Sequence, residues 1–96
     1  MGLLGLFRRQ PIDTEAARRT RLLTTGRIAE GTIFDVGADD TGAVTQMFYR
    51  YEIGGVEYES SQTLDEDQRT HTANYYPGAR VTIRFDPRQP ANALVV

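Results

Sequence analysis

The chain has 96 residues, of which 40% are hydrophobic and 25% are charged, and its net charge is -2. This length suits one small domain with a thin hydrophobic core. The lack of cysteine excludes disulfides and thiolate metal sites. The longest near-apolar run covers residues 1–7, far short of the roughly 20 residues that a membrane-spanning helix needs. Arginines follow that run instead of preceding it, which argues against a signal peptide, so we expect a cytoplasmic protein.

The charges are unevenly distributed along the chain. Residues 1–27 hold six arginines against two acidic residues, and residues 28–96 hold five arginines against eleven acidic residues, so the net charges are +4 and -6. A basic arm on an acidic body fits an anionic membrane surface, nucleic acid, or attraction between arm and body. All 11 basic residues are arginine, which is typical of a GC-rich bacterial genome.

The first predicted element is a helix from about Thr14 to Leu23 that ends near Gly26, with Asp13 or Thr14 as its N-cap. Its apolar stripe is narrow, so the helix is expected to cover an edge or an end of a sheet. The stripe consists of Ile12, Ala16, Thr20 and Leu23.

A strand is predicted from Arg27 to Val36, followed by a loop over residues 37–42. Gly31 within this strand suggests a bulge or a bend. The alternation leaves two choices for the buried face: either Ile28, Thr32 and Phe34, or Ala29 and Ile33.

The next stretch predicts a hairpin. The strand from about Val44 to Ile53 alternates clearly, and Gly54-Gly55 forms a two-residue turn because both glycines can adopt a positive φ. This turn fixes the register with a strand from Val56 to about Gln62. The expected cross-strand neighbours include Tyr51 with Tyr58, Tyr49 with Ser60, Arg50 with Glu59, and Glu52 with Glu57.

The last third predicts a weak helix and one or two strands. Thr63–Glu66 and Asp65–Gln68 each have the form of a capping box, and the helix must end before Pro77. Pro77-Gly78 predicts a turn into a strand whose core face is Val81, Ile83 and Phe85. Asp86-Pro87 and Pro90 are expected to end that strand, and Ala93–Val96 can form a short closing strand.

The predicted fold class is therefore mainly β with minor α. It is a small antiparallel sheet of four or five strands, or a partly open barrel, with an N-terminal helix and a weak helix before strand four. We expect residues 1–12 to be a flexible apolar and basic tail and residues 13–96 to be a single small β domain.

Residues 25–96 resemble the bacterial family called domain of unknown function 3592. The resemblance is carried by the strand Phe48–Ile53, the Gly55-x-x-Tyr58 hairpin, and Tyr76-Pro77-Gly78 followed by Val81-x-Ile83-x-Phe85-Asp86-Pro87-x-x-Pro90. The run Thr25-Gly26-x-x-Ala29-x-Gly31 also looks like the opening strand of that family. The resemblance implies a small β domain, often beside membrane helices, and it implies no catalytic residues.

The candidate chemical sites are better explained by local structure. His71 is the only histidine and lacks partners for a zinc site. Asp35, Asp39 and Asp40 fit a solvated turn better than a calcium loop. Asp65–Asp67 suits helix capping, and Asp86 suits a turn whose backbone amides its side chain can bind. We therefore expect no enzyme, no catalytic residue, no metal and no cofactor.

The leading hypothesis is a non-catalytic domain that acts through protein contacts, either with further copies of itself or with another protein partner. The residues proposed for such a surface are Tyr75, Tyr76, Phe48, Arg18, Arg19 and Arg21. An alternative is a small barrel that binds a small ligand or single-stranded nucleic acid through exposed tyrosines, since tyrosine rings can stack on bases. Nucleic acid is disfavoured, because the sheet body is acidic.

A third hypothesis is a peripheral membrane protein anchored by residues 1–9. Apolar side chains there can enter a lipid surface while the arginines meet the headgroups. The residues expected to make this contact are Leu3, Leu4, Leu6, Phe7, Arg8 and Arg9.

Overall fold

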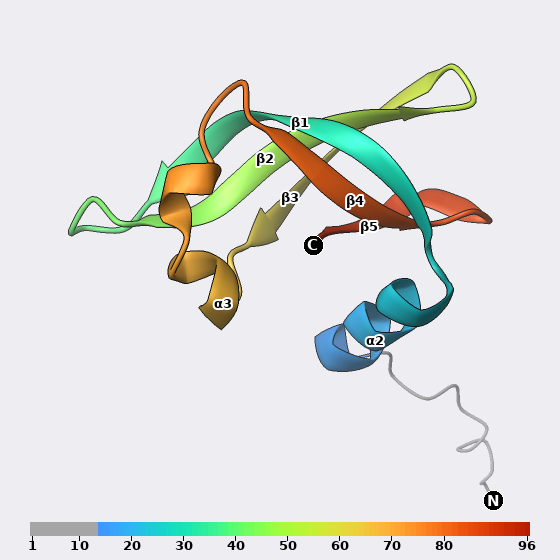
Figure 1. Cartoon of the computed structure of the whole chain (residues 1–96), viewed down its shortest axis with the longest axis horizontal. Coiled ribbons are helices and arrows are strands. Elements are labelled where there is room, and N and C mark those ends of the chain that lie inside the picture. The colour runs from blue at the N-terminus through green and yellow to red at the C-terminus, as the bar shows by residue number, and fades with distance from the viewer. Residues whose placement is uncertain (1–13) are drawn as a thin grey trace, which may run out of the picture.

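Five antiparallel strands form one sheet in the order β3-β2-β1-β4-β5. The computed structural model describes residues 14–96, so the predicted tail at residues 1–12 lies outside the described part of the chain. The strands are β1 (Arg27–Ala38), β2 (Val44–Ile53), β3 (Val56–Thr63), β4 (Arg80–Asp86) and β5 (Gln89–Val95). The helical elements are α2 (Glu15–Thr25), α3 (Glu66–Arg69) and the 3-10 turn η1 (Thr72–Asn74). The sheet curls so that its two edge strands approach each other, which gives a nearly closed barrel (Figure 1).

The observed register of the β2–β3 hairpin confirms the predicted one. Both turn glycines have a positive φ, 59° at Gly54 and 82° at Gly55. Tyr51 pairs with Tyr58 and Arg50 pairs with Glu59, as the turn requires. A two-residue turn with two left-handed positions matches the right-handed twist of the flanking strands, so the local sequence determines this pairing.

Strand β1 is the centre of the sheet and pairs with two partners. Its first half pairs with β4 and its second half with β2, and the two ladders overlap at Gly31 and Thr32. A Cβ atom at Gly31 would overlap the Ile83 side chain and lie 2.9 Å from the Arg50 carbonyl oxygen. Gly31 therefore marks a close approach of neighbouring strands, and the predicted bulge lies three residues later, between Ile33 and Asp35.

The core lies inside the curled sheet. Of the two choices for β1, the structure buries Ile33 completely and Ala29 partly, whereas Ile28 and Phe34 face outward. Val81, Ile83 and Phe85 are buried as expected. The core cluster consists of Ile33, Met47, Tyr49, Tyr51, Leu64, Ala79, Val81, Ile83, Phe85, Ala93 and Val95.

Strand β5 begins earlier than predicted. The Asp86 carboxylate accepts a hydrogen bond of 2.8 Å from the Arg88 amide, which supports its expected role in the turn. The chain then re-enters the sheet at Gln89 instead of Ala93. Pro90 is tolerated because it lies in the irregular stretch between the pairs Asp86–Gln89 and Phe85–Ala93, where the ladder has no regular bond for it to break.

Two glutamine side chains close the gap between β3 and β5. The Val95 amide donates to Gln62 Oε1 at 2.9 Å, and Gln62 Nε2 donates to the Val95 carbonyl oxygen at 3.1 Å. Gln68 Nε2 donates to the same carbonyl oxygen at 3.0 Å. Side-chain amides thus bind the backbone of an edge strand where a closed barrel would have a backbone ladder.

Helix α3 is fixed by the second of the two predicted capping boxes. Asp65 accepts from the Gln68 amide at 2.7 Å, and Gln68 Oε1 accepts from the Asp65 amide at 3.0 Å. The first box, starting at Thr63, does not form because that residue is the last of β3. The box at Asp65 orients Gln68 toward the gap between β3 and β5.

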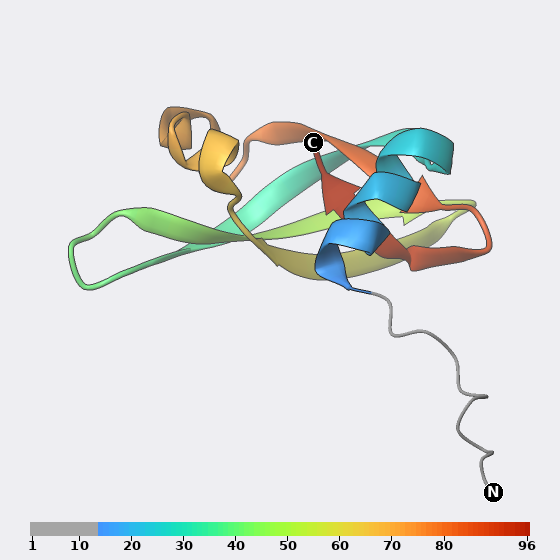
Figure 2. The same cartoon turned by 90° about the horizontal axis from the view of Figure 1, so that it is seen from below.

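Helix α2 packs across β4 and β5 (Figure 2). Thr14 is its N-cap and Gly26 its C-cap. Over the described residues the predicted apolar stripe is wrong, because Leu22 is the buried residue and Leu23, Ala16 and Thr20 are exposed. The fourth member of that stripe, Ile12, lies outside the described residues. The face toward the sheet is polar apart from Leu22, so helical periodicity of apolar residues gave the wrong side. Within residues 14–96, the helices are too short and too polar to cross a bilayer.

Candidate functional site

Two of the five tyrosines are core residues, with Tyr49 and Tyr51 buried on the inner face of β2. Their rings stack at 5.9 Å, and Tyr51 stacks on the half-buried Tyr58 at 5.5 Å. The Tyr51 hydroxyl donates to the Pro90 carbonyl oxygen. The Tyr49 hydroxyl lies 3.4 Å from the Ala93 carbonyl oxygen. Burial, with smaller effects of the two neighbouring tyrosines, raises the pKa of Tyr51 to about 12. These rings therefore hold β5 in place and are not available to a ligand.

The arginines of α2 hold the helix to the domain. Arg18 Nη1 donates to Asn92 Oδ1 at 2.8 Å and to the Ala93 carbonyl oxygen at 3.0 Å. Arg19 Nη2 lies 2.7 Å from Asp65 Oδ2 and so links α2 to the cap of α3. The third predicted arginine, Arg21, is exposed. The structure thus uses Arg18 and Arg19 in intramolecular contacts and does not bring them together with the predicted aromatic residues.

Tyr75 and Tyr76 lie next to each other before the turn into β4 but differ in environment. Tyr75 is half-buried against the core, and burial, followed by the nearby Asp65 carboxylate, raises its pKa. Tyr76 is 56% exposed and borders an open groove of about 580 Å³. Its turn is fixed to β1, since the Gly78 amide donates to the Ile33 carbonyl oxygen at 2.7 Å. Tyr76 is therefore the one exposed tyrosine among the five.

The outer face of the sheet, opposite the core, carries an aromatic cluster. The rings of Phe34 and Phe48 lie 6.3 Å apart, and the Arg50 guanidinium lies 4.6 Å above the Phe34 ring. Phe34 is 36% exposed and Phe48 is half-buried. A guanidinium at this distance is attracted by the ring quadrupole, which holds the three side chains together. We call these three residues the outer aromatic patch.

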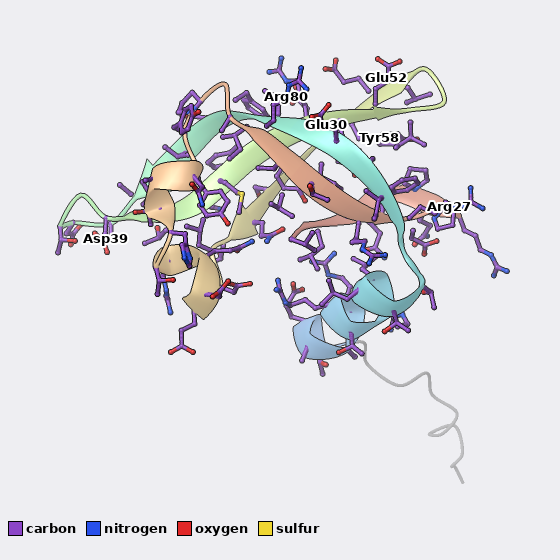
Figure 3. All side chains as sticks on the ribbon, in the orientation of Figure 1. Arg27, Glu30, Asp39, Glu52, Tyr58 and Arg80 are labelled. Atoms are coloured by element: carbon purple, nitrogen blue, oxygen red, sulfur yellow. The ribbon has the colours of Figure 1, made fainter. Side chains whose placement is uncertain are left out.

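Charged side chains surround the outer aromatic patch on the same face. Arg50 lies 3.9 Å from both Glu57 and Glu59 on β3. Glu52 is paired with Glu57 in the hairpin, so two like charges face each other there. Beyond them Arg80 Nη1 lies 2.7 Å from Glu30 Oε2. Figure 3 shows Glu30, Glu52 and Arg80 projecting from one side of the sheet.

The alternation of β2 predicted Phe48 and Arg50 on one outer face, but it did not place Phe34 with them, and Arg50 was not among the predicted interaction residues. Phe34 belonged to one of two alternatives for the buried face of β1, and alternation alone did not choose between them. The bulge between Ile33 and Asp35 places Phe34 beside Phe48. The choice between the two faces was settled only by the structure, in which the complete burial of Ile33 shows which side of β1 faces the core.

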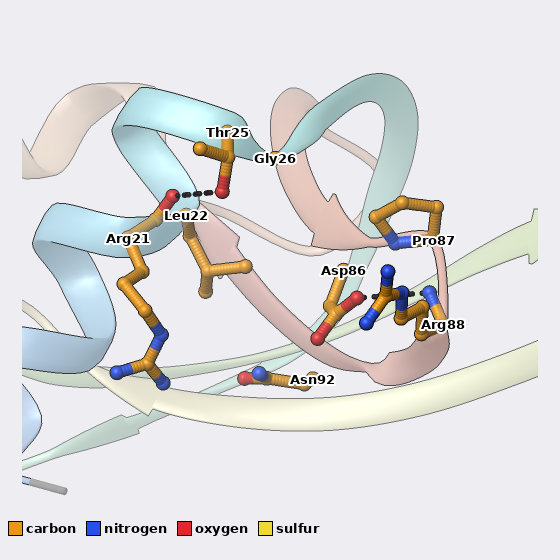
Figure 4. Close-up of a pocket in the computed structure, with 8 residues that line it drawn as sticks. All are labelled: Arg21, Leu22, Thr25, Gly26, Asp86, Pro87, Arg88 and Asn92. Carbon is orange, nitrogen blue, oxygen red and sulfur yellow. Dashed lines mark hydrogen bonds between the residues drawn. The ribbon is translucent and has the colours of Figure 1, made fainter.

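A separate cleft of about 350 Å³ lies between the C-terminal end of α2 and the β4–β5 turn (Figure 4). It is lined by the side chains of Arg21 and Arg88 but also by the Asp86 carboxylate. The carbonyl end of the helix dipole adds negative potential next to Thr25. Because both signs of charge are present, the lining favours neither an anion nor a cation.

The predicted turn and surface roles of the polar residues agree with the structure where it describes them. Asp39 accepts from the Thr41 hydroxyl at 2.6 Å and from the Thr41 and Ala43 amides, and the Thr41 hydroxyl is the main reason that its pKa is lowered. His71 is exposed, with Nδ1 beside the Thr70 hydroxyl. Across residues 14–96, no group of three or more His, Cys, Asp or Glu side chains could hold a metal ion.

Comparison with known protein families gives one match, to the family described as Domain of unknown function (DUF3592), over residues 24–96. The chain belongs to the DUF3592 family. Neither a search of curated proteins nor a search of solved structures finds a match.

The match defines which features belong to the DUF3592 domain itself. It begins at Thr24, so it includes all five strands, the outer aromatic patch and both bridging glutamines. Most of α2, including Arg18 and Arg19, precedes the matched residues. In the ion pair between Arg19 and Asp65, which we call the α2 latch, Arg19 therefore lies outside the matched residues and Asp65 lies within them.

Proposed function

We propose that this DUF3592 domain is a non-catalytic module that works through protein contacts and associates with further copies of itself. The outer aromatic patch is the observation that carries the proposal. Phe34 exposes a third of its surface beside Phe48, and Arg50 covers part of its ring. Aromatic residues and arginine are the types enriched at the centres of protein interfaces, where they contribute most of the binding energy.

The two sheet edges are poorly suited to self-association, which favours the face. The β3 edge carries Glu57 and Glu59, so two β3 strands placed side by side would bring carboxylates together. The β5 edge already has side-chain partners, because Gln62 binds Val95 and Arg18 binds the Ala93 carbonyl oxygen. A contact through the outer face leaves these bonds intact.

Binding of a base or small ligand through the tyrosines has less support. Tyr49 and Tyr51 are buried, and their hydroxyls face carbonyl oxygens of β5. Tyr76 alone offers a single exposed ring, whereas stacking platforms for single strands use several rings in a basic groove. The Arg80 guanidinium in the groove beside Tyr76 is already paired with Glu30 at 2.7 Å, and Glu52 and Glu57 on the outer face have the wrong sign for phosphate.

The test is the molar mass of the protein in solution over a concentration series, measured by light scattering or sedimentation. We expect the full chain to associate, and we expect Phe34→Ser to weaken association about tenfold or more, as loss of a central aromatic side chain does. The matched control is Leu23→Ser, because Leu23 is 44% exposed on α2, away from the outer face. A full chain that stays monomeric throughout, or a Phe34→Ser protein that associates like the Leu23→Ser protein, contradicts the proposal.

A further inference from the structure

The outer face is matched by a segment of the chain that lies before the described residues. We infer that residues 1–9 of one copy dock on the outer face of a second copy, with apolar side chains on the outer aromatic patch and arginines on the neighbouring glutamates. The inference rests on the proposed self-association and names the segment that drives it.

The segment has the composition that such a surface selects. Its sequence is Met1-Gly2-Leu3-Leu4-Gly5-Leu6-Phe7-Arg8-Arg9, so a run of large apolar residues is followed directly by two cations. Leu6 and Phe7 can bury surface against aromatic rings, and the guanidinium groups of Arg8 and Arg9 can form two-pronged bonds with carboxylates.

Along the hairpin, the outer face presents first an aromatic ring and then carboxylates, as the segment presents first apolar side chains and then arginines. Phe48 and Glu52 lie four residues apart on β2, on the same side, which is about 13 Å along a strand. Glu57 pairs with Glu52, and within residues 14–96 no cation lies within ion-pair distance of Glu52. Residues 3–9 span about 20 Å when extended, so one segment can contact the patch and these glutamates together.

A second copy supplies the segment more readily than the same chain does. The described chain begins at Thr14 at the start of α2. Figure 3 places α2 on the other side of the molecule from the labelled side chains Glu30, Glu52 and Arg80. About 17 Å of extended chain joins Arg9 to Thr14, and in the same copy this length would have to pass around a sheet edge. A neighbouring copy meets the outer face directly from solvent.

The same nine residues also suit an anionic lipid surface. The outer face, however, carries both aromatic rings and glutamates, which match the apolar and the cationic parts of the segment. This match favours a segment bound to protein. Because the paired glutamates at Glu52 and Glu57 repel each other, neutralising them with arginine also stabilises the hairpin.

The first experiment compares the molar mass of the full chain with that of a variant lacking residues 1–12, which retains the Thr14 cap of α2. We expect the full chain to associate and the deletion variant to be a monomer with unchanged unfolding. If the deletion variant associates like the full chain, the inference is wrong while the proposed function survives. If the full chain is itself monomeric, both fail.

The second experiment titrates a fluorescent peptide of residues 1–12 into the deletion variant and measures anisotropy. We expect saturable binding that weakens about tenfold with Phe34→Ser or Glu52→Lys and falls as salt rises. Glu66→Lys is the matched control, since it makes the same charge change on α3 and leaves the capping box in place. Equal affinity for the Glu52→Lys and Glu66→Lys proteins overturns the inference. Peptide that binds anionic vesicles but not the deletion variant also overturns it and favours a membrane role.

Discussion

Replacement of Gln62 by methionine tests whether a side-chain bridge closes the barrel. In the wild-type protein the buried Val95 amide donates to Gln62 Oε1 at 2.9 Å. Methionine fills a similar volume but cannot accept this bond, so the amide is left without a partner. The Val95 carbonyl oxygen keeps its bond to Gln68, and the cost is therefore that of one buried unsatisfied donor. We expect the free energy of unfolding to fall by about 2 kcal/mol, within the usual range of 1–3 kcal/mol.

Urea unfolding followed by circular dichroism measures this difference, and thermal unfolding should shift by roughly 8–16 °C. Gln89→Met is the control, because Gln89 is exposed at the start of β5, and it should change stability by less than about 0.5 kcal/mol. Gln68→Met should cost about 1 kcal/mol, since it removes one bond to Asp65 and leaves Val95 satisfied by Gln62.

The double variant gives the sharper readout. With both glutamines replaced, the Val95 carbonyl oxygen loses both of its side-chain donors, so the double variant should lose more stability than the two single variants added together. Strict additivity, or a Gln62→Met protein as stable as the Gln89→Met control, would refute the bridge as the element that closes the sheet.

Three further predictions follow from the packing. Gly31→Ala should lower the free energy of unfolding by about 1–3 kcal/mol, because the added methyl group would overlap Ile83. Gly37→Ala is the control and should cost less, since the nearest neighbour of its methyl group lies 3.5 Å away. Chemical unfolding of the two variants measures the difference. Tyr51 should ionise only near pH 12 in an absorbance titration. Its folded pKa exceeds the unfolded value of about 10, so its contribution to stability is complete below pH 10 and is lost as pH rises toward 12; ionisation with the exposed tyrosine would contradict this. Asp65→Ala should cost about 1–2 kcal/mol and increase hydrogen exchange in both α2 and α3, and an effect confined to α3 would argue against the latch.

Local patterns were sufficient for most of the sheet. The register of the β2–β3 hairpin follows from two glycines and from strict alternation, because a two-residue turn allows only one pairing. The core face of β4 and the turn at Pro77-Gly78 also follow from nearest neighbours in the sequence. Each of these features is set by a local turn and by alternation along adjacent stretches of the chain.

The errors fall where distant segments meet. Leu22 and not Leu23 is buried on α2, because the contacts of Arg18 and Arg19 with Asn92 and Asp65 orient the helix. No periodicity in the helix contains that information. The assignment of Phe34 to the outer aromatic patch likewise depended on a bulge in β1, whose position reflects the fit between β1 and β2.

The sequence by itself determined a mainly β domain, its hairpin register, its turns and its family, since these depend on local backbone preferences and alternation. Only the tertiary structure decided how the sheet closes, which face of β1 is exposed, and which arginines hold α2. The physical reason is that Gln62, Gln68 and Arg18 look like ordinary surface residues in the sequence. They acquire their roles when curling of the sheet brings the unpaired backbone of β5 within hydrogen-bond distance.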